Sequence, residues 1–582
     1  MRIRRPAGTL FTRLVLDVEQ DGCDHCGSRL HICDHRRRCI YTLEGPRELC
    51  CRLAHCADPT CPRRCRTLSP KAEWSRALPG WLIGWDVFGF IGHRRFARHW
   101  SVPQIRAELR DSYDIPLSVG AIAQYVRRYQ TMVAARQQDR QQLSDAYRDI
   151  DSLVLTIDGL QPEKGHETLY TVREVNAKRV WFAEALLSSS TAEIGRLLVR
   201  ARAIAEYLGK PVRLWMSDKQ DAFVKGIAHV FPDVPHRYCV NHFLRDLAKP
   251  MRKADSHAKV QLRKKVRGLR AIEREALEQL RQVRTQAKPG RDVTVEEQAE
   301  AKPTATSRRG TTRRRRLGQA AVVAKQSKQE QPSHQETEDS VAQVVLDYCT
   351  VVRGILNDDQ GGPLQPTGLR MAEALGEVRA SLQRNLDLNK SGPAHAQLAR
   401  LAGCIDRGLD AVKEKQQPIK KQVEQIRAVA ETLQEDQGPR KQRKARYGKL
   451  QRAYQKQDDA FSAHLAKLMR SFASGLFVRI RLKKGEQLPT DNDELERWFR
   501  KPKGHARRIH GRKHAGVRIV QEGATLLPTL NAHETHPKPF TAAELLPFWQ
   551  AVEPDSQREA LQRRKIMGKA RSKKSDPSNC QI

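Results

Sequence analysis

Long apolar runs are absent from this sequence of 582 residues. No stretch approaches the roughly 20 consecutive apolar residues that a helix needs to cross a bilayer. The N-terminus, MRIRRPAGTLFTRLVLD, also lacks the long apolar core of a secretory signal. These absences argue against a membrane-spanning protein and predict one that resides in the cytoplasm without a membrane partner.

Acidic residues are scarce relative to basic ones. The chain contains 105 Lys and Arg but only 67 Asp and Glu, which gives a formal net charge of +38, and the excess recurs along the whole length. Many distributed cations suit a long polyanion better than a small acidic substrate, because each phosphate contact releases counterions. The balance favours nucleic acid as the partner, with an anionic membrane surface as the weaker alternative.

Cysteine is nearly absent outside one short segment. Nine of the thirteen cysteines fall between Cys23 and Cys65, and the other four are scattered through the remaining chain. Such a distribution suits a local metal site better than a disulfide framework. The sequence therefore also predicts a reducing compartment.

The cysteine-rich segment offers two pairs of thiolates. Cys23 and Cys26 form a Cys-x-x-Cys pair, and Cys56 with Cys61 supplies a second, wider pair. Four thiolates commonly bind a structural zinc ion, so the pattern predicts a zinc ribbon rather than free thiols. The width of the second pair leaves four other ligands open: Cys50, Cys51, His55 and Cys65. A second ion, or none, could lie at Cys33, His35 and Cys39.

Helical periodicity, interrupted once, marks the next segment. SVPQIRAELRDSYDIPLSVGAIAQYVRRYQ predicts two short amphipathic helices separated at DIPLS, with Ser118 as the N-cap of the second. Arg127 and Arg128 then lie near the end of that second helix. The pattern predicts a helix-turn-helix, and an ordinary helical hairpin is the alternative.

Apolar, β-rich runs begin at Leu153. LVLTIDGLQ, TLYTVREV and RVWFAEALL predict three strands, followed by a helix, the strand VRLWMSDK, a second helix and the strand-like run PHRYCVNHF. The later crossovers imply parallel pairing, which gives the order of an RNase H-like α/β sheet. Asp158 and Asp218 come at the carboxyl ends of two strands, where open α/β sheets bind ligands. With a third carboxylate, they would form a hard Mg²⁺ or Mn²⁺ site.

Strand patterns are missing for a long stretch after His242. Helical periodicity continues to about 475, interrupted by a polar tract at about 285–338 that cannot bury enough apolar surface to fold alone. This tract is predicted to be a disordered basic linker. The residues 536–582 end in a basic run and are predicted to form a largely disordered tail.

Four acids crowd the stretch TDNDELERWF at 490–499. On a helix, Leu495, Trp498 and Phe499 would form one apolar stripe. Glu494 and Glu496 would flank that stripe on opposite sides, so only one of them could face the strand carboxylates. Helical geometry alone does not choose between them.

Basic residues dominate the chain immediately after these acids. From residue 497 to residue 518 there are nine Lys and Arg and no acid. Beside a metal-binding carboxylate, such a run is typical of a surface that holds a DNA backbone. An exposed helix face is the alternative.

Together these motifs resemble the DDE transposases of bacterial insertion sequences. The resemblance rests on LTIDGL, WMSDKQDAF, HRYCVNHF and DELERWFRKPKGHARRIHGRKHAG, and the Cys-x-x-His is similar to that of the Mutator-like branch. It implies that Asp158, Asp218 and Glu496 form the catalytic triad and bind Mg²⁺ or Mn²⁺, with two ions expected. It also implies a structural or positioning role for Cys239 and His242 beside the active site.

The resemblance further implies a multidomain organisation. Its parts are a zinc-ribbon DNA-binding module (1–70), a helix-turn-helix region (71–148), an RNase H-like catalytic core in two pieces (149–250 and 476–535), a large all-α insertion (251–475) and the tail (536–582). Eight side chains are expected to contact DNA: Arg127, Arg128, Arg500, Lys503, Arg507, Arg508, Arg512 and Lys513.

The activity implied is DNA transposition. A homo-oligomer associated with the bacterial nucleoid would bind the terminal inverted repeats in double-stranded DNA, cleave a strand at each end and join it to target DNA. A catalytically silent or domesticated DNA-binding regulator is the alternative. An RNase H-type nuclease would share the acidic site but would need no end-specific binding domain.

Overall fold

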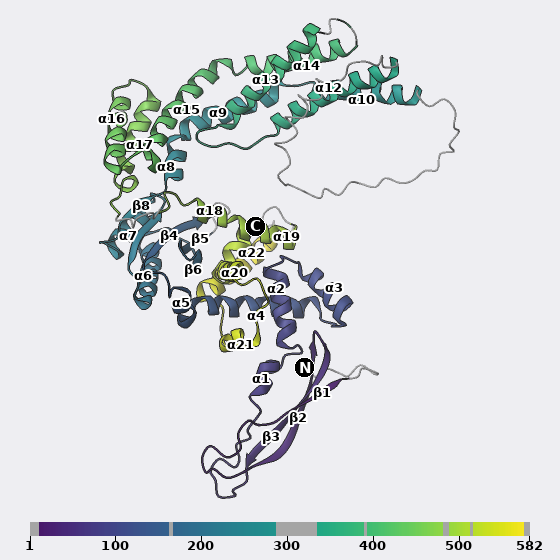
Figure 1. Ribbon diagram of the computed structural model, residues 1–582, viewed down its shortest axis with the longest axis vertical. Helices are drawn as coiled ribbons and strands as arrows, with labels where there is room; N and C mark the ends of the chain where they lie inside the picture. Colours follow the sequence, from purple (N-terminus) through teal and green to yellow (C-terminus); the bar gives the residue numbers. More distant parts are fainter. Residues whose placement is uncertain are drawn as a thin grey trace, which may run out of the picture. The chain divides into compact units, whose positions relative to one another are not determined.

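The computed structural model describes residues 11–161, 167–286, 334–388, 391, 393–480, 488–511 and 516–574. The chain forms two compact units, one made of Met1–Phe243 with Ser471–Ile582 and the other of Leu244–Arg470. The first unit is mixed α/β and contains two sheets, whereas the described part of the second is built from helices (Figure 1). Within the described residues, no helix is long and apolar enough to cross a membrane.

The N-terminal sheet has the strand order β1-β3-β2. Its strands are β1 (Thr12–Leu16), β2 (Leu30–Thr42) and β3 (Gly45–Cys56). The central strand β3 pairs parallel to β1 and antiparallel to β2. Gly45, with φ of 114°, closes the tight turn between β2 and β3, where a side chain would be strained. Much of β2 stays exposed because this small sheet has little core.

A group of helices follows this sheet in the first unit. They are α1 (Ala72–Arg76), α2 (Trp85–Phe96), α3 (Val102–Tyr113), α4 (Val119–Gln138) and α5 (Arg140–Ala146). The predicted cap is confirmed, because the Ser118 hydroxyl accepts a hydrogen bond from the Ala121 amide at 3.1 Å. The second helix of the pair is longer than the pattern predicted, so Arg127 and Arg128 lie in its middle rather than near its end.

The second sheet has the strand order β6-β5-β4-β7-β8. Its strands are β4 (Leu153–Leu160), β5 (Thr168–Glu174), β6 (Arg179–Leu186), β7 (Val212–Ser217) and β8 (His236–Tyr238). β4, β5 and β6 pair antiparallel, whereas β7 pairs parallel to both β4 and β8. The predicted parallel pairing of the later strands is therefore confirmed. The last strand is shorter than its apolar run suggested, because helix α8 (Val240–Leu247) begins directly after Cys239.

Helices cover both faces of this sheet (Figure 1). On one face, α6 (Thr191–Leu208) and α7 (Asp221–Val230) pack Leu197 and Phe223 against the strands. On the other face, α4 and α20 (Gly516–Thr535) contact β6 and share a second apolar cluster with it. Because both faces are covered, β4 is buried along nearly its whole length.

The C-terminal part of the first unit contains more structure than its composition suggested. Its elements are α18 (Asp493–Trp498), α19 (Arg500–His510), α20, α21 (Ala542–Leu545), η3 (Leu546–Phe548) and α22 (Asp555–Lys574). The prediction of a largely disordered tail is therefore wrong for residues 536–574. A few buried apolar anchors, Phe540, Leu545 and Ala560, fix this segment despite its many charges. Residues 575–582 lie outside the description.

The described part of the second unit is helical. Its elements are α9 (Lys249–Lys265), α10 (Leu269–Gln286), α12 (His334–Leu356), α13 (Thr367–Leu388), α14 (Pro393–Asp410), α15 (Lys413–Leu433), η2 (Glu435–Gln437), α16 (Arg440–Gln455) and α17 (Ala460–Leu476), the last of which extends into the first unit. An apolar cluster that includes Leu262, Leu375 and Leu401 joins several of these helices. Most of the tract predicted as disordered, 285–338, lies outside the described residues.

Candidate functional site

Two aspartates meet at the carboxyl ends of β4 and β7. The parallel register pairs Thr156 with Met216, so continuing it by two residues brings Asp158 opposite Asp218. Asp158 belongs to β4 itself and is buried, and its Oδ1 accepts a hydrogen bond from the Gly159 amide at 2.7 Å. Adjacent parallel strands therefore bring together the two acids that the strand pattern singled out.

Helix α18 brings a third carboxylate to the same place. His242 Nδ1 lies 2.7 Å from Asp218 Oδ1 and 3.3 Å from Glu496 Oε1. Burial, together with the nearby charge of Asp218, raises the pKa of Asp158 to about 7, and Glu496 adds to this effect. We call Asp158, Asp218 and Glu496 the carboxylate cluster. Its members are far apart in the sequence and repel one another electrostatically.

The neighbouring acid Glu494 points to a different partner. Its Oε1 lies 3.1 Å from Nη1 of Arg173, a side chain on β5 that is only 3% exposed. Leu495 and Trp498 lie on the side of α18 between Glu494 and Glu496. Both are buried, as the predicted apolar stripe requires. The fold thus separates two glutamates that helical geometry alone could not distinguish.

The start of α18 is held by residues next to the two strand aspartates. The Asn492 amide donates to Cys239 Sγ at 3.2 Å, and the Asn492 side chain accepts a hydrogen bond from the Thr156 hydroxyl. The Val240 amide donates to the Thr490 carbonyl at 3.3 Å. Cys239 is fully buried. Its thiol therefore contacts the start of the helix that carries Glu496.

A second possible ligand set overlaps the carboxylate cluster. One ligand atom each from Asp218, Cys239 and His242 lies within 4.8 Å of the others, so this group could hold a metal ion, and neither Asp158 nor Glu496 belongs to it. Asp218 Oδ1 and His242 Nδ1 are buried and, despite their short separation, form no directed hydrogen bond.

The environment of His242 favours its charged form. Burial lowers the pKa of His242, but Asp218 and Cys239 outweigh this effect and raise the pKa to about 11. In the structure, β7 pairs with β8, which aligns Ser217 with Tyr238 and so brings Asp218 beside Cys239. Sequence reasoning considered the Cys-x-x-His pair alone and missed its third member.

The four predicted zinc ligands meet at one end of the N-terminal sheet. The Sγ atoms of Cys23, Cys26, Cys56 and Cys61 all lie within 4.8 Å of one another, with Cys23 3.9 Å from Cys61 and Cys26 3.4 Å from Cys56. A tetrahedral ion with Zn–S bonds of about 2.3 Å would need sulfur separations of about 3.8 Å. Hydrogen bonding by Ser28 lowers the pKa of Cys26 to about 6, which favours a thiolate. This group could hold a metal ion such as zinc.

The other candidate ligands of this segment stay outside the group. Among the described residues, Cys50, Cys51, His55 and Cys65 are not part of it, and Cys33, His35 and Cys39 form no metal-holding group of their own. Cys33 is exposed and donates to the Leu53 carbonyl at 3.4 Å. Burial, together with the nearby Glu73, raises the thiol pKa of Cys51 to about 11.

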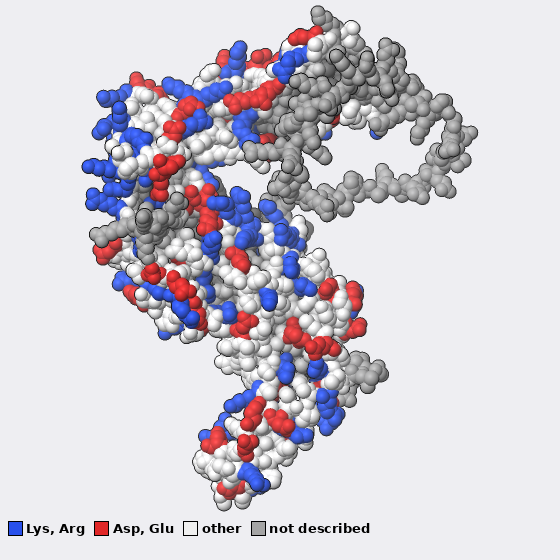
Figure 2. Space-filling view, in the orientation of Figure 1, with Lys and Arg blue, Asp and Glu red and all other residues white. Residues whose placement is uncertain are grey.

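Helix α19 presents a basic face to solvent. Pro502, His505, Ala506 and Ile509 are buried, whereas the exposed positions include four of the predicted DNA contacts: Arg500, Lys503, Arg507 and Arg508. Figure 2 shows Lys and Arg side chains gathered over α19. The helix breaks at Phe499, so Arg500 and Lys503 belong to α19 and not to the helix that carries Glu496. Arg512 and Lys513 lie outside the described residues.

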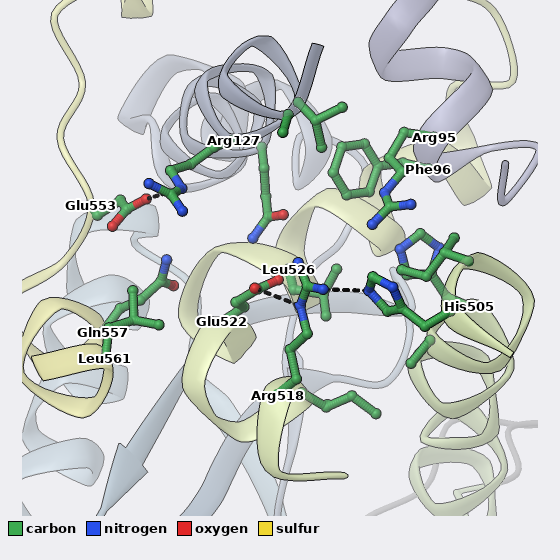
Figure 3. Close-up of a pocket in the computed structure, with 17 residues that line it drawn as sticks. Arg95, Phe96, Arg127, His505, Arg518, Glu522, Leu526, Glu553, Gln557 and Leu561 are labelled. Atoms are coloured by element: carbon green, nitrogen blue, oxygen red, sulfur yellow. Dashed lines mark hydrogen bonds and ion pairs between the residues drawn. The ribbon is translucent and has the colours of Figure 1, made fainter. Parts of the chain in front are cut away.

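The two arginines of α4 differ in their availability. Arg128 donates to the Ala551 carbonyl at 2.5 Å and is used within the fold. Arg127 remains 76% exposed and lies 3.8 Å from Glu553. Arg127 also lines a pocket of about 120 Å³ that includes Arg95 and His505, drawn in Figure 3. No member of the carboxylate cluster lines this pocket.

Comparison with known proteins gives no match: neither a protein-family model nor a curated protein sequence matches this chain.

Proposed function

We propose that this protein is a DNA transposase that cleaves element ends and joins them to target DNA, with Asp158, Asp218 and Glu496 as its metal-binding acids. The single observation that carries the proposal is the convergence of these three acids, from β4, the end of β7 and α18, around His242. Carboxylates crowd together in this way when a hard divalent cation balances their charge.

The strand order supports an RNase H-like core. Three antiparallel strands are followed by two parallel ones, and the two aspartates lie on the first strand and directly after the fourth in chain order. This is the arrangement expected from the resemblance to DDE transposases. The separate helical unit, Leu244–Arg470, falls between the second acid and the third, as the expected insertion would.

The donor chemistry of the cluster suits a hard divalent cation, although its three carboxylates do not all lie within 4.8 Å of one another in this structure. Asp158 is buried beside a second carboxylate, and Asp218 Oδ1 is buried without a directed hydrogen bond. Asp158, Asp218 and Glu496 would hold Mg²⁺ or Mn²⁺, which when bound supplies charge stabilisation for in-line phosphoryl transfer. His242 then orients Asp218 and Glu496, because its Nδ1 lies close to both. Cys239 fixes the start of α18 and so the position of Glu496.

DNA contacts are proposed on three elements. The exposed cations of α19 follow Glu496 directly and suit the strand that is cleaved. Arg127 on α4 and the N-terminal sheet, with zinc at its four cysteines, would bind the element ends. Two ends must be joined, so a homo-oligomer is expected on DNA.

The test is a nicking assay on a supercoiled plasmid that carries the candidate inverted repeats, with and without Mg²⁺. Wild type should nick only with the metal ion, and Asp158→Asn should lose nicking while still protecting the repeats in a footprint. Asp221→Asn is the matched control, because Asp221 is an exposed aspartate at the start of α7 outside the cluster. If Asp158→Asn still nicked the plasmid, the proposed catalytic role of the carboxylate cluster would be wrong.

The remaining outcomes separate the alternative functions. Repeat-specific footprints without any metal-dependent nicking by the wild type would favour a DNA-binding regulator. Nicking without repeat-specific footprints would favour a nuclease.

A further inference from the structure

One helix of the second unit concentrates positive charge without balancing acids. Helix α16 has seven Lys and Arg in sixteen residues and no Asp or Glu. Only Tyr447 and Tyr454 of this helix are buried. Figure 2 shows Lys and Arg side chains crowded over the region of α16. Packing within the unit therefore does not explain why this helix has so many basic residues.

Some of these cations serve the fold. Arg443 donates to the carbonyls of Leu433 at 2.9 Å and Gly438 at 3.0 Å, and Arg446 donates to the Gln437 carbonyl. These bonds satisfy carbonyl groups at and just beyond the end of α15. Arg443 and Arg446 therefore have a structural explanation and are set aside.

Four other cations have no such explanation. Lys441, Lys444, Lys449 and Arg452 are exposed, and no described carboxylate lies within ion-pair distance of them. At 100° per residue they fall within an arc of about 140° that faces away from the two buried tyrosines, and they extend over about 17 Å. We call these four residues the basic ridge.

A glycine within this arc supports close approach of a partner. A Cβ added to Gly448 would meet no atom within 4 Å, so packing does not require glycine there. Glycine in the middle of a helix lowers helix stability. Its presence between Lys444 and Lys449 is explained if the helix backbone must come near another molecule.

The chemistry of the ridge selects the partner. Both tyrosines are buried and bonded, Tyr447 to the Met469 carbonyl at 2.9 Å and Tyr454 to the Gln425 carbonyl at 3.1 Å. The exposed face therefore offers no aromatic ring for stacking single-stranded bases and no apolar stripe for insertion into a membrane. A broad face of cations suits the regularly spaced phosphates of a duplex.

We infer that the basic ridge of α16 binds the sugar-phosphate backbone of double-stranded DNA without reading its sequence. This inference rests on the part of the proposed function that makes DNA the partner, and it does not depend on strand cleavage. The helical unit would then be a DNA-holding element and not only a spacer between two parts of the core.

The experiment measures binding of the full chain to a labelled 30-base-pair duplex of arbitrary sequence by fluorescence anisotropy, without Mg²⁺, across a series of salt concentrations. The ridge variant replaces Lys441, Lys444, Lys449 and Arg452 by Gln. Each lost phosphate contact lowers the slope of log K against log salt by about 0.9, so the slope should fall by up to about 3.6 and affinity should drop roughly tenfold or more.

A matched control removes the same charge from the same unit. It replaces four cations that are already in ion pairs with acids, Arg379, Arg400, Lys420 and Arg427, by Gln. This control should bind within about twofold of wild type if position matters and net charge does not. Gly448→Gln adds bulk without changing charge and should weaken binding severalfold, with far-ultraviolet circular dichroism confirming that the helix still forms.

Three outcomes would overturn the inference. The first is equal loss of affinity in the ridge variant and in the paired-cation control. The second is unchanged binding in both the ridge variant and Gly448→Gln. The third is tighter ridge-dependent binding to single-stranded RNA or to phosphatidylglycerol vesicles than to the duplex. A negative result in the nicking assay alone would not contradict DNA binding by the basic ridge. Equally, a negative result for the ridge variant would not contradict the proposed role of the carboxylate cluster.

Discussion

Glu494 and Glu496 lie two positions apart on α18 and have different electrostatic environments. Glu494 pairs with Arg173, whose side chain is 3% exposed and whose Nε has no hydrogen-bond partner. Glu496 instead lies 3.3 Å from His242 and adds negative charge to a site that already holds two aspartates. Removing the charge of Glu494 therefore leaves a buried cation without its acid, whereas removing the charge of Glu496 relieves repulsion between the acids and loses an attraction to His242.

This difference predicts opposite results for the same substitution. Glu494→Gln should lower the free energy of unfolding by about 1 to 2 kcal/mol, a value reduced for the partial exposure of Glu494, and should leave metal-dependent nicking intact. Glu496→Gln should cost little stability and abolish nicking and strand transfer, with binding to element ends retained. Urea unfolding and the nicking assay measure the two effects. A catalytic loss in Glu494→Gln with unchanged stability would reverse the assignment.

At the scale of elements, the N-terminal sheet has little apolar core among the described residues. Two small clusters lie within it, one of Cys23, Cys56 and Cys61 with Leu30 beside them, and one of Ile40, Leu49 and Ala77. The first cluster consists mainly of the proposed metal ligands. Its order should therefore depend on zinc, because structural zinc sites contribute directly to the free energy of folding.

Zinc removal should have a local effect on this element. The wild type is expected to bind one zinc ion per chain through these cysteines, measured by mass spectrometry of the metal or by release to a chromogenic chelator. Cys26→Ser should lose the ion and expose the sheet to proteolysis, whereas Cys33→Ser, an exposed cysteine outside the group, should keep it. Loss of zinc in Cys33→Ser but not in Cys26→Ser would contradict the ligand set.

Local patterns predicted the elements better than the contacts between them. The β-rich runs around Asp158 and Asp218 gave strands with the predicted parallel pairing, and Ser118 caps its helix as predicted. The partner of Glu494 was not predictable, because Arg173 lies on a strand more than three hundred residues earlier and carries no sequence signal for this contact. The C-terminal helices were missed because few apolar anchors are dispersed among many charges.

At the scale of the whole molecule, the two units can be followed separately. All eight tryptophans belong to the unit of Met1–Phe243 with Ser471–Ile582, so tryptophan fluorescence reports on that unit alone. The same unit buries several histidines. Burial lowers the pKa of His93, lowers that of His505 strongly and lowers that of His533 to about 4. A protein with these buried neutral groups should lose stability in mild acid.

The effect of pH on stability can be tested at His533. Its Nε2 lies 3.0 Å from the Tyr129 hydroxyl, and burial, with nearby histidines His93, His99 and His536, disfavours its charged form. Between about pH 6.5 and pH 4 the unfolded chain binds a proton at this residue and the folded chain does not, so stability falls as the pH falls through this window and does not change with this group above it. The full loss is about 3 kcal/mol for the shift from 6.5 to about 4.

Comparison of two substitutions separates titration from bonding at this site. His533→Gln removes the titrating group, so urea unfolding followed by tryptophan fluorescence at pH 7.5 and pH 4.5 should show a smaller acid-induced loss than in the wild type. Tyr129→Phe removes the hydroxyl partner but keeps the histidine, so it should lower stability at both pH values and retain the acid-induced loss. An unchanged loss in His533→Gln would mean that other buried groups, His505 first among them, set the acid sensitivity of this unit.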